Sequence, residues 1–420
     1  MSQFRFARLG LIVAALGLNL APSAVGLSSV AYAADTKGET LRPEVGKLLQ
    51  SATELMKAQK YKDALAKVRE ADAISGKTAF EAYTTDRMRG ALAIAVGDTD
   101  TAARSFEASI ATGRVSEADQ VKFAQALAGA YYRAKDYSKS IVWLNRYFKE
   151  GGTDPQMRPL LVQAYYLSGD YGRAAKEVQA DVQAEEKAGR TPSEDTLLML
   201  ADCENRQKNQ VGYVAAVEKL ATYHPKKEYW NDLLSRTLTK PGFSERLNLD
   251  VYRLKLAAGQ LKSENEFSEM AQLALQAGFP AEAKKVVDLA YQTKVFGTGP
   301  EAARQKRLQA LADKSAADDL KTMAQGEADA AKAKDGTGLI NLGYAYVTTG
   351  QFDKGVALME QGFSKGGLKR PEDAKLHMGI AYHFAGQKAK AFQTFHTVQG
   401  TDGSADLARY WLMLVNHPIN

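Results

Sequence analysis

The sequence predicts an all-α protein built from stacked pairs of helices, and three observations support this fold class. Alanine occupies 67 of the 420 positions and proline only 11. This balance favours helices, because alanine loses no side-chain entropy in a helix and proline breaks one. A short phrase also recurs every 34 to 39 residues along most of the chain. Finally, the single cysteine cannot form an internal disulfide, which excludes a disulfide-stapled secreted β scaffold.

Residues 1–33 have the features of a secretory signal peptide. Two arginines precede an apolar run over residues 9–21, and the segment ends in Ala31-Tyr-Ala33. A positive start, an apolar middle and a small-x-small cleavage site are the marks of such a signal. We therefore expect cleavage near Ala33 and a mature protein in the periplasm with no integral membrane span. The alternative is a retained anchor, but Pro22 and nearby serines interrupt the roughly 20 apolar residues that a span needs.

The charge of the mature chain is nearly balanced. Loss of residues 1–33 removes two arginines and leaves 53 basic and 49 acidic side chains, a net charge of +4. No run of five or more like charges occurs, and such runs mark the tails that bind nucleic acid. We expect no nucleic-acid partner.

The recurring phrase marks the turn between the two helices of each predicted pair. It joins Gly or Lys to an aromatic residue two positions later, with a small residue three positions further on. Copies are Lys135-Asp-Tyr137, Gly169-Asp-Tyr171, Gly350-Gln-Phe352, Gln59-Lys-Tyr61 with Gln at the first position, and Gly386-Gln-Lys388 with Lys at the aromatic position. The aromatic position places units at 61, 99, 137, 171, 210, 244, 280, 316, 352 and 388. The array is thus predicted over 45–403, after a short segment over 34–44, with two short helices around Leu308 and Leu320 in the unit at 316.

Residues 404–420 are predicted to end the array with a capping helix and a short tail. The last unit of a stacked array has no following neighbour to cover its apolar face. The helix is predicted over Ser404–Asn416. Trp411 and Leu414 are expected to cover the open end.

Residues within the units resemble those of the tetratricopeptide repeat, whose period is about 34 residues. The matching segments are Leu342-Gly343-x-x-Tyr346, Met378-Gly379-x-x-Tyr382, Leu161-x-x-x-Tyr165, Ala174-x-x-x-Val178 and Ala391-x-x-x-Phe395. The resemblance implies a right-handed superhelical solenoid of about ten helix pairs. In each pair, a small residue lets the two helices approach closely, and large residues fill the seam to the next unit.

Two potential nucleophiles have structural interpretations that we favour. Gly362-Phe-Ser364-Lys-Gly366 matches the nucleophile elbow of hydrolases, but that motif requires a strand before the serine. Here a predicted helix precedes Ser364, so a helix end and turn is expected instead. Cys203 lies in a predicted helix and is expected to be a small buried residue.

Three histidines of the last unit could be read as a metal cluster. His377, His383 and His396 are separated by 6 and 13 residues, which matches no helical pair of ligands. We expect these histidines to be packing or surface residues. The sequence thus predicts neither an enzyme nor a metal or cofactor; the alternative function is a cell-envelope hydrolase or cell-wall enzyme with an unrecognised site.

The tetratricopeptide resemblance implies a ligand groove lined by the first helix of each pair. By register, the expected partner-binding residues are Lys122, Gln125, Tyr132, Gln156, Gln163, Tyr166, Asp202, Asn205, Tyr344 and His383. Tyrosine rings supply apolar area and amides bind a peptide backbone, so an extended protein or peptide segment is the expected partner. The alternative is that these side chains are only solvated or packed between helices.

A narrower resemblance covers roughly the second half of the mature chain. Its segments are Tyr223-His-Pro-Lys-Lys-Glu-Tyr-Trp230, Gly366-Gly-Leu-Lys-Arg-Pro371 and Ala408-Arg-Tyr-Trp-Leu412. They are similar to exported tetratricopeptide proteins encoded beside TonB energy-transduction components. The resemblance implies an accessory role near TonB-dependent uptake, with TonB-system components as partners.

Overall fold

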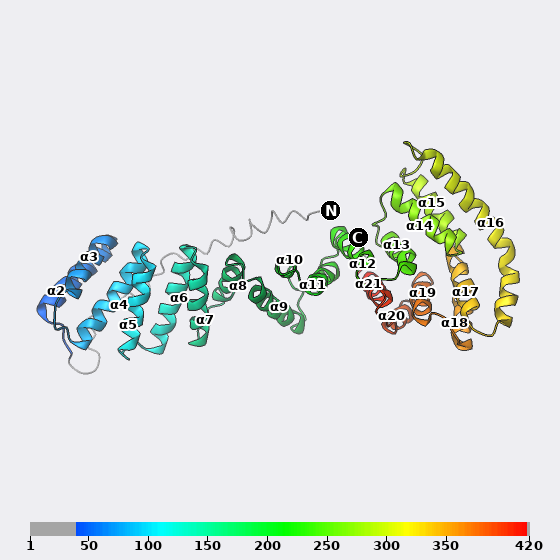
Figure 1. The fold of residues 1–420 in the computed structure, drawn as a ribbon. Helices are drawn as coiled ribbons and strands as arrows, with labels where there is room; N and C mark the ends of the chain where they lie inside the picture. Colours follow the sequence, from blue (N-terminus) through cyan, green and yellow to red (C-terminus); the bar gives the residue numbers. More distant parts are fainter. Residues whose placement is uncertain (1–38, 418–420) are drawn as a thin grey trace. The chain divides into compact units, whose positions relative to one another are not determined.

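The computed structural model describes residues 39–417, and in this part of the chain the secondary structure is helical with no strand (Figure 1). The all-α prediction is therefore confirmed. The chain divides into two compact units. The first contains the described residues up to Gly189 together with Asp202–Asn209, and the second contains Arg190–Ala201 together with the residues from Gln210 onward. The predicted signal segment over 1–33 lies outside the described residues.

The first unit is a row of antiparallel helices in which consecutive helices pack together. The helices are α2 (Pro43–Lys57), α3 (Tyr61–Asp72), α4 (Ala79–Val96), α5 (Thr99–Ala111), α6 (Glu117–Arg133), α7 (Tyr137–Lys149), α8 (Met157–Leu167) and α9 (Tyr171–Lys187). The end of α10 (Glu194–Arg206) also belongs to this unit.

The recurring phrase begins the second helix of a pair, as predicted, and its residues explain why. Tyr137 and Tyr171 are the first residues of α7 and α9. The aspartates before them are N-caps that accept hydrogen bonds from Lys139 N and Arg173 N, both at 3.1 Å. Such bonds satisfy backbone donors that the first helical turn leaves unpaired. Gly169 has a φ of 84°, a left-handed conformation that glycine adopts without strain.

The second unit contains the start of α10 and eleven further α-helices. They are α11 (Gln210–Tyr223), α12 (Lys227–Leu238), α13 (Asn248–Ala257), α14 (Glu264–Gln276), α15 (Pro280–Gln292), α16 (Ala302–Lys332), α17 (Thr337–Thr349), α18 (Phe352–Lys365), α19 (Pro371–Phe384), α20 (Lys388–His396) and α21 (Ser404–Asn416). A short 3₁₀ turn, η2 (Glu245–Leu247), precedes α13. None of the described helices is both long enough and apolar enough to span a membrane.

The prediction of two short helices in the unit at 316 is wrong, because α16 is one continuous helix of 31 residues. No glycine or proline occurs between Ala302 and Gln325 to end it. Its inward stripe runs through Leu308, Ala312, Ala316 and Met323, which are buried along its length. The spacing of about 36 residues therefore continues from α15 to α18, although α16 lies between them without the turn that separates the two helices of the other units.

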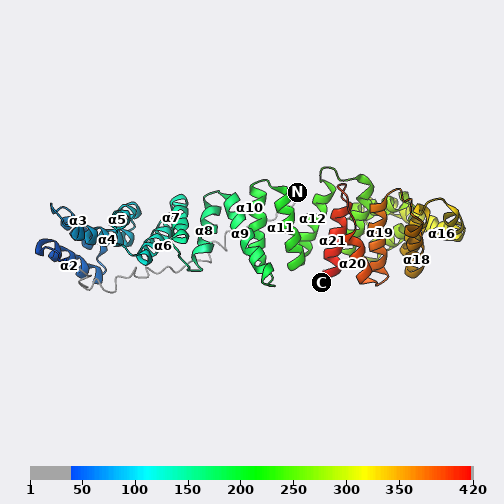
Figure 2. The same ribbon diagram turned by 90° about the horizontal axis from the view of Figure 1, so that it is seen from below.

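The C-terminal helix does not cover an open end, which corrects the prediction made for Trp411 and Leu414. Helix α21 packs on α19 and α20, as expected of a cap, but it also packs on α13. Figure 1 and Figure 2 show α21 close to α12 as well as to α20. Ser244 N donates a hydrogen bond to Asp402 O at 2.9 Å, and the Arg409 guanidinium pairs with Glu218 at 2.8 Å. The last helix of the second unit thus returns to its first helices.

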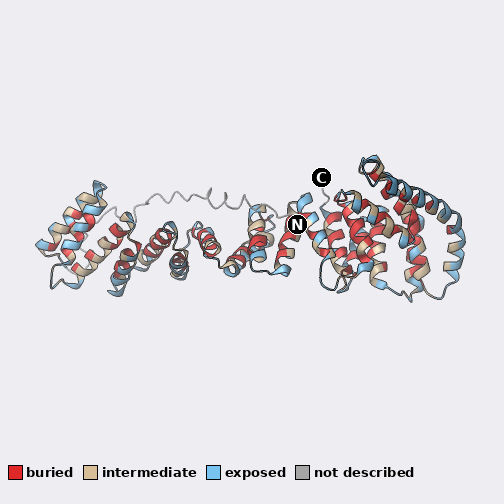
Figure 3. Ribbon diagram, turned by 45° about the horizontal axis from the view of Figure 1, so that its top comes forward, coloured by how far each residue is buried: buried red, intermediate tan, exposed pale blue. Residues whose placement is uncertain are grey.

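Helix α13 is buried on all sides. Every residue from Leu249 to Lys255 is buried, including the charged residues Asp250, Arg253 and Lys255. Figure 3 shows buried residues throughout the packed helices of the second unit. A helix surrounded by other elements has no solvated face to receive its charged side chains. Its charges must therefore find partners inside the unit.

Candidate functional site

Two tyrosine pairs, one repeat apart, join neighbouring helices in the first unit. The first tyrosine of each pair is buried and bonds to the preceding pair of helices. Tyr131 Oη donates to Asp100 Oδ1 of α5 at 2.8 Å, and Tyr165 Oη accepts from Asn145 Nδ2 of α7 at 3.2 Å. These two phenols tie α6 and α8 to the helices before them.

The second tyrosine of each pair is half-buried and bonds to the first helix of the next pair, so that α6 is joined to α8 and α8 to α10. Tyr132 Oη donates to Gln163 Oε1 at 2.9 Å, and Tyr166 Oη donates to Asp202 Oδ2 at 2.6 Å. The predicted groove residues are therefore brought together, but as partners of one another. Each phenol is held in place by a side chain from the first helix of the next pair.

The same two tyrosines also contact the aromatic residues of the recurring phrase. Tyr132 lies edge-to-face on Tyr137 with centroids 5.4 Å apart and planes at 67°, and Tyr166 lies on Tyr171 at 5.4 Å and 71°. Edge-to-face arrangements are favourable for aromatic pairs. Two successive repeats thus present nearly identical aromatic pairs. We call Tyr132, Tyr137, Tyr166 and Tyr171 the aromatic face.

One end of the aromatic face carries a guanidinium. Arg206 lies over the rings of Tyr166 and Tyr171, at 5.3 and 5.1 Å from their centroids. Its Nε donates to Asp202 Oδ2 at 2.7 Å and its Nη1 to Tyr171 Oη at 3.2 Å. Asp202 therefore fixes both the Tyr166 phenol and the Arg206 guanidinium.

The electrostatics of the aromatic face keep its groups in their ordinary protonation states. Burial and the hydrogen bond to Asp202 raise the pKa of Tyr166, and burial raises the pKa of Tyr132. The hydrogen bond to Asp202 raises the pKa of Arg206. The phenols thus remain donors and the guanidinium remains charged at neutral pH.

The predicted groove residues differ in their accessibility. Lys122, Gln156 and Asn205 are exposed, whereas Gln125, Tyr132, Tyr166 and His383 are half-buried. Gln163, Asp202 and Tyr344 are buried, with at most 6% of each side chain exposed. The expectation that these three line a groove is not met, because they lie beneath the surface.

The predicted groove residues lie in both units of the chain, and three contributors to the aromatic face were missed. Tyr344 and His383 belong to the second unit, whereas the other eight predicted residues lie in the first. Gln125 donates to Asp154 Oδ2 at 2.8 Å. Arg206 was not predicted, and Tyr137 and Tyr171 were treated only as turn markers. For Tyr137 and Tyr171, the recurrence of an aromatic residue at the same position of the phrase was the sequence signal that could have revealed their role.

The second unit contains a buried ionic network centred on Arg253 of α13. The guanidinium makes a bidentate pair with Glu282 of α15, with Nε–Oε1 and Nη2–Oε2 distances of 2.8 and 2.7 Å. Its Nη1 also donates to Asp250 Oδ1 at 2.7 Å. Burial alone would raise the pKa of Asp250, but the charges of His377 and Arg253 lower it below its ordinary value. Charged residues of α13 and α15 therefore meet His377 of α19 in one cluster.

His377 takes part in this network, which corrects its assignment as a packing or surface residue. Its Nε2 lies 2.8 Å from Asp250 Oδ1, and its ring stacks on Tyr344 with centroids 4.6 Å apart. The Arg253 guanidinium also lies 4.7 Å from the Tyr344 ring centroid. These polar groups satisfy one another, which is the arrangement of a structural network.

The other two histidines match the expectation of packing and surface positions. His383 is half-buried beside Trp411, with ring centroids 5.7 Å apart, and burial lowers its pKa. His396 is exposed and contacts Phe392. Within residues 39–417, no group of three or more His, Cys, Asp or Glu side chains is placed to hold a metal ion.

The two potential nucleophiles lie in helices. Ser364 is in the last turn of α18, which ends at Lys365 and is followed by Gly366 with a φ of 72°. Cys203 is fully buried, and burial raises the pKa of its thiol to about 12. The thiolate is the reactive form of cysteine, so this residue is inert at neutral pH. Both residues have the structural positions that the sequence indicated.

Comparisons with known proteins bear on the fold alone. No family model matches the chain, and no curated protein matches it. Among solved structures, it is similar to Naa15/Naa10 bound to HypK-THB, at 15% identity over 86% of this chain and 58% of that chain, with a TM-score of 0.29. It thus spans less than two thirds of that chain.

Two further structures are similar at lower scores. They are yeast Tom70, at 11% identity over 88% of this chain and 95% of that chain with a TM-score of 0.24, and the TPR2AB domain of yeast Sti1 in complex with pHSP90, at 13% identity over 71% and 99% with a TM-score of 0.23. Since these scores lie below 0.5, the assignment to helical repeats rests on the chain's own helices and turns. The protein is an all-α chain of repeated helix pairs.

Proposed function

We propose that the protein is an exported scaffold that binds a protein or peptide partner through the aromatic face of its first unit. The observation that carries this proposal is the repetition of the edge-to-face tyrosine pair in two successive repeats, with Arg206 stacked at one end. Tyrosine and arginine are, with tryptophan, the residues enriched among binding hot spots.

The rigidity of the aromatic face supports the same proposal. Gln163 and Asp202 hold the two phenols by hydrogen bonds, so the rings lose little conformational freedom when a partner binds. Exposed Lys122, Gln156 and Asn205 supply the polar groups expected at the rim of an interface. Rigid aromatic area with a polar rim suits an extended peptide segment.

The location and the partner are part of the proposal. The charged start, the apolar run and the Ala31-Tyr-Ala33 site support export to the periplasm. The resemblance of 223–230, 366–371 and 408–412 to proteins encoded beside TonB components supports TonB-system components as the partners to test first. N-terminal sequencing of the periplasmic product should find Ala34 as the first residue, and finding Met1 or Ser2 would refute cleavage.

The test of partner binding compares two double variants of the aromatic face. Tyr132→Ala with Tyr166→Ala removes the rings and should weaken binding by about 2–4 kcal/mol, the range of two hot-spot aromatics. Tyr132→Phe with Tyr166→Phe removes only the phenol bonds to Gln163 and Asp202 and keeps the ring area. It should bind the partner nearly normally, while each lost bond lowers the free energy of unfolding by about 0.5–1.5 kcal/mol.

The measurement is calorimetric titration of the purified mature protein with candidate TonB-system fragments, accompanied by circular dichroism. Normal binding by a folded alanine variant would refute the aromatic face as the binding site. Equal loss of binding by the phenylalanine variant would show that the hydroxyl bonds, not the rings, are responsible.

A further inference from the structure

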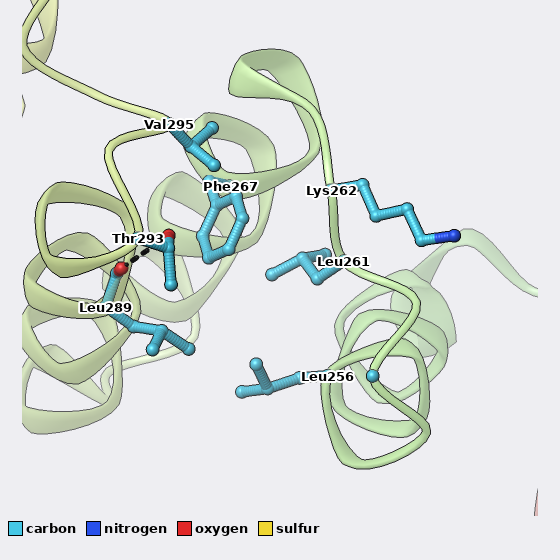
Figure 4. Close-up of a pocket in the computed structure, with 8 residues that line it drawn as sticks. Leu256, Leu261, Lys262, Phe267, Leu289, Thr293 and Val295 are labelled. Atoms are coloured by element: carbon cyan, nitrogen blue, oxygen red, sulfur yellow. Dashed lines mark hydrogen bonds between the residues drawn. The ribbon is translucent and has the colours of Figure 1, made fainter. Parts of the chain in front are cut away.

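A second feature of the molecule, an apolar cavity in the second unit, lies between the end of α13 and helices α14 and α15. Its volume is about 330 Å³. The apolar side chains that line it are Leu256, Leu261, Phe267, Leu289 and Val295, and Figure 4 shows Leu256, Leu261, Phe267 and Leu289 around a common space. Leu256, Leu289 and Val295 are only half-buried, so this apolar surface is not sealed from solvent.

The size and lining of the cavity indicate an aliphatic or aromatic occupant. An apolar cavity of about 150 Å³ accommodates benzene, so a cavity of this volume has room for a longer chain. Pockets of roughly 300 Å³ and more are typical of small-molecule sites. The polar residues of the lining, Thr293 and Lys262, are exposed and therefore belong to its mouth. The cavity is thus apolar inside and polar only at its edge.

Two exposed lysines belong to the chain segments that line the cavity, and one of them, Lys262, is itself a lining residue. Lys262 lines the cavity, and in Figure 4 its side chain extends away from the apolar side chains. Lys294 is exposed and lies between the lining residues Thr293 and Val295. Within residues 39–417, neither ammonium forms an ion pair. Two nearby carboxylates have partners of their own: Glu266 pairs with Lys255 at 3.0 Å and accepts from Lys262 N at 3.2 Å, and Asp288 pairs with Lys284 at 3.0 Å.

We propose that this cavity binds the unbranched aliphatic chain of an anionic amphiphile, with its anionic head at Lys262 and Lys294. Burial of the chain supplies the affinity, at about 0.8 kcal/mol for each methylene group removed from water. The two ammonium groups select an anionic head over a neutral or cationic one. The ligand chemistry is shared by free fatty acids and by anionic lipids. This site is independent of the partner-binding face of the first unit.

The first test is calorimetric titration of the mature protein with decanoate, comparing variants that fill the cavity. Leu289→Trp should weaken decanoate binding by about tenfold or more, since excluding even two methylene groups has that effect. Val295→Phe fills the same space and serves as the second variant should Leu289→Trp fail to fold. Leu311→Trp is the matched control, because Leu311 is 53% exposed on α16 and lies outside the cavity.

The second test separates the head group from the chain. Lys262→Gln with Lys294→Gln should weaken decanoate binding about three- to tenfold, as expected for two exposed ion pairs, and leave the binding of neutral octanol unchanged. Glutamine suits position 294, where φ is 59°, because Gln59 has the same φ. Lys306→Gln with Lys314→Gln, two exposed lysines of α16, is the matched control.

Vesicles distinguish the source of the ligand. Capture by phosphatidylglycerol vesicles that is lost in Leu289→Trp identifies a lipid chain, whereas decanoate binding without vesicle capture identifies a free carboxylate; both support the proposal. Decanoate binding that is undetectable, or equal in wild type and the cavity-filling variants, overturns it. Vesicle capture that depends on the lysines but not on Leu289 also overturns it, because it requires only surface charge.

Discussion

Two glycines determine how closely α17 and α18 approach. A Cβ atom on Gly343 would lie 2.6 Å from Gly355 O, and one on Gly355 would lie 2.6 Å from Gly343 O. No side chain fits at such distances without moving a helix. The predicted role of the small residue in each pair, close approach of its two helices, is visible here in the backbone.

A pair of glycine-to-alanine substitutions tests this role. Gly343→Ala should lower the free energy of unfolding by about 1–3 kcal/mol, the usual effect of overpacking. Gly326→Ala in the interior of α16 should raise it by about 0.5–1 kcal/mol, because alanine favours the helix. A Cβ there would lie 3.8 Å from Leu342, an ordinary contact. Urea denaturation of both variants measures the difference, and equal effects would contradict the close-approach argument.

The Arg253 network offers a second test with single residues. Arg253→Met should lower the free energy of unfolding by about 3–5 kcal/mol, because Glu282 loses its buried partner and Asp250 one of its two. The control is Arg304→Met on α16, whose pair with Glu301 is 3.5 Å long and exposed on both sides. An exposed pair contributes about 0–1 kcal/mol. Similar losses in both variants would show that burial does not matter at Arg253.

At the scale of elements, α21 joins two ends of the second unit. Trp411 is fully buried and stacks on Phe395 with centroids 6.2 Å apart and planes at 7°. The helix that carries it packs on α13 as well as on α19 and α20. The Trp411 ring itself contacts His383 and Phe384 of α19 and Phe395 of α20, and it anchors the helix that also packs on α13.

Trp411→Ala should lower the free energy of unfolding by about 3–5 kcal/mol, as large-to-small core substitutions of this size do. Hydrogen exchange should accelerate in α13 as well as in α19 and α20, since α21 packs on all three. Exchange confined to α18–α20 would indicate a simple open end, and the contact with α13 would then contribute nothing.

At the scale of the whole molecule, ion pairs close the second unit. They link α11, the loop before η2, η2 and α13 with α19, the loop before α21 and α21 itself. The pairs are Glu218–Arg409, Lys240–Asp406, Arg246–Asp373 and Arg246–Asp402, and the hydrogen bond between Asp250 and His377 adds a further link. Each depends on an ionised carboxylate. The hydrogen bond from Arg246 lowers the pKa of Asp402 to about 2, and the pKa of Asp250 is also lowered.

The lowered pKa values predict that acid weakens this closure. A carboxylate whose folded pKa lies below its unfolded value of about 3.9 stabilises the fold above that pH and ceases to do so as pH falls through the folded pKa. The free energy of unfolding of the second unit should therefore fall between about pH 4 and pH 2. Hydrogen exchange of α13 and α21 against pH measures this.

Asp402→Asn should reduce the pH dependence of that unfolding, because it removes one of the titrating carboxylates. Asp353→Asn, which removes an exposed carboxylate of α18 outside the closure, is the control. A steeper or unchanged acid dependence in Asp402→Asn would contradict the assignment of this carboxylate to the closure.

The sequence by itself determined the helical class, the turns and the close approaches. Alanine content and the recurring phrase predicted the starts of α3, α7, α9, α18 and α20, because capping, glycine conformation and aromatic placement act within a few residues of the turn. Register also predicted that Tyr132 and Tyr166 occupy equivalent places, since one repeat separates them. These are local properties, and local patterns report them directly.

Only the tertiary structure decided how the second unit closes and which polar groups are buried. Asp250 and His377 are 127 residues apart, and Glu218 and Arg409 are 191 residues apart, so no periodic pattern links them. Helix α16 is continuous because no glycine or proline ends it between Ala302 and Gln325. The regular spacing of the units nevertheless led to the prediction of a turn there. Gln163 and Asp202 were predicted as groove residues but are buried. Each lies against a tyrosine of the preceding pair of helices, Tyr132 or Tyr166, and this contact depends on how successive pairs stack. Burial and long-range pairing depend on which helices stack, and the period of a repeat does not specify this.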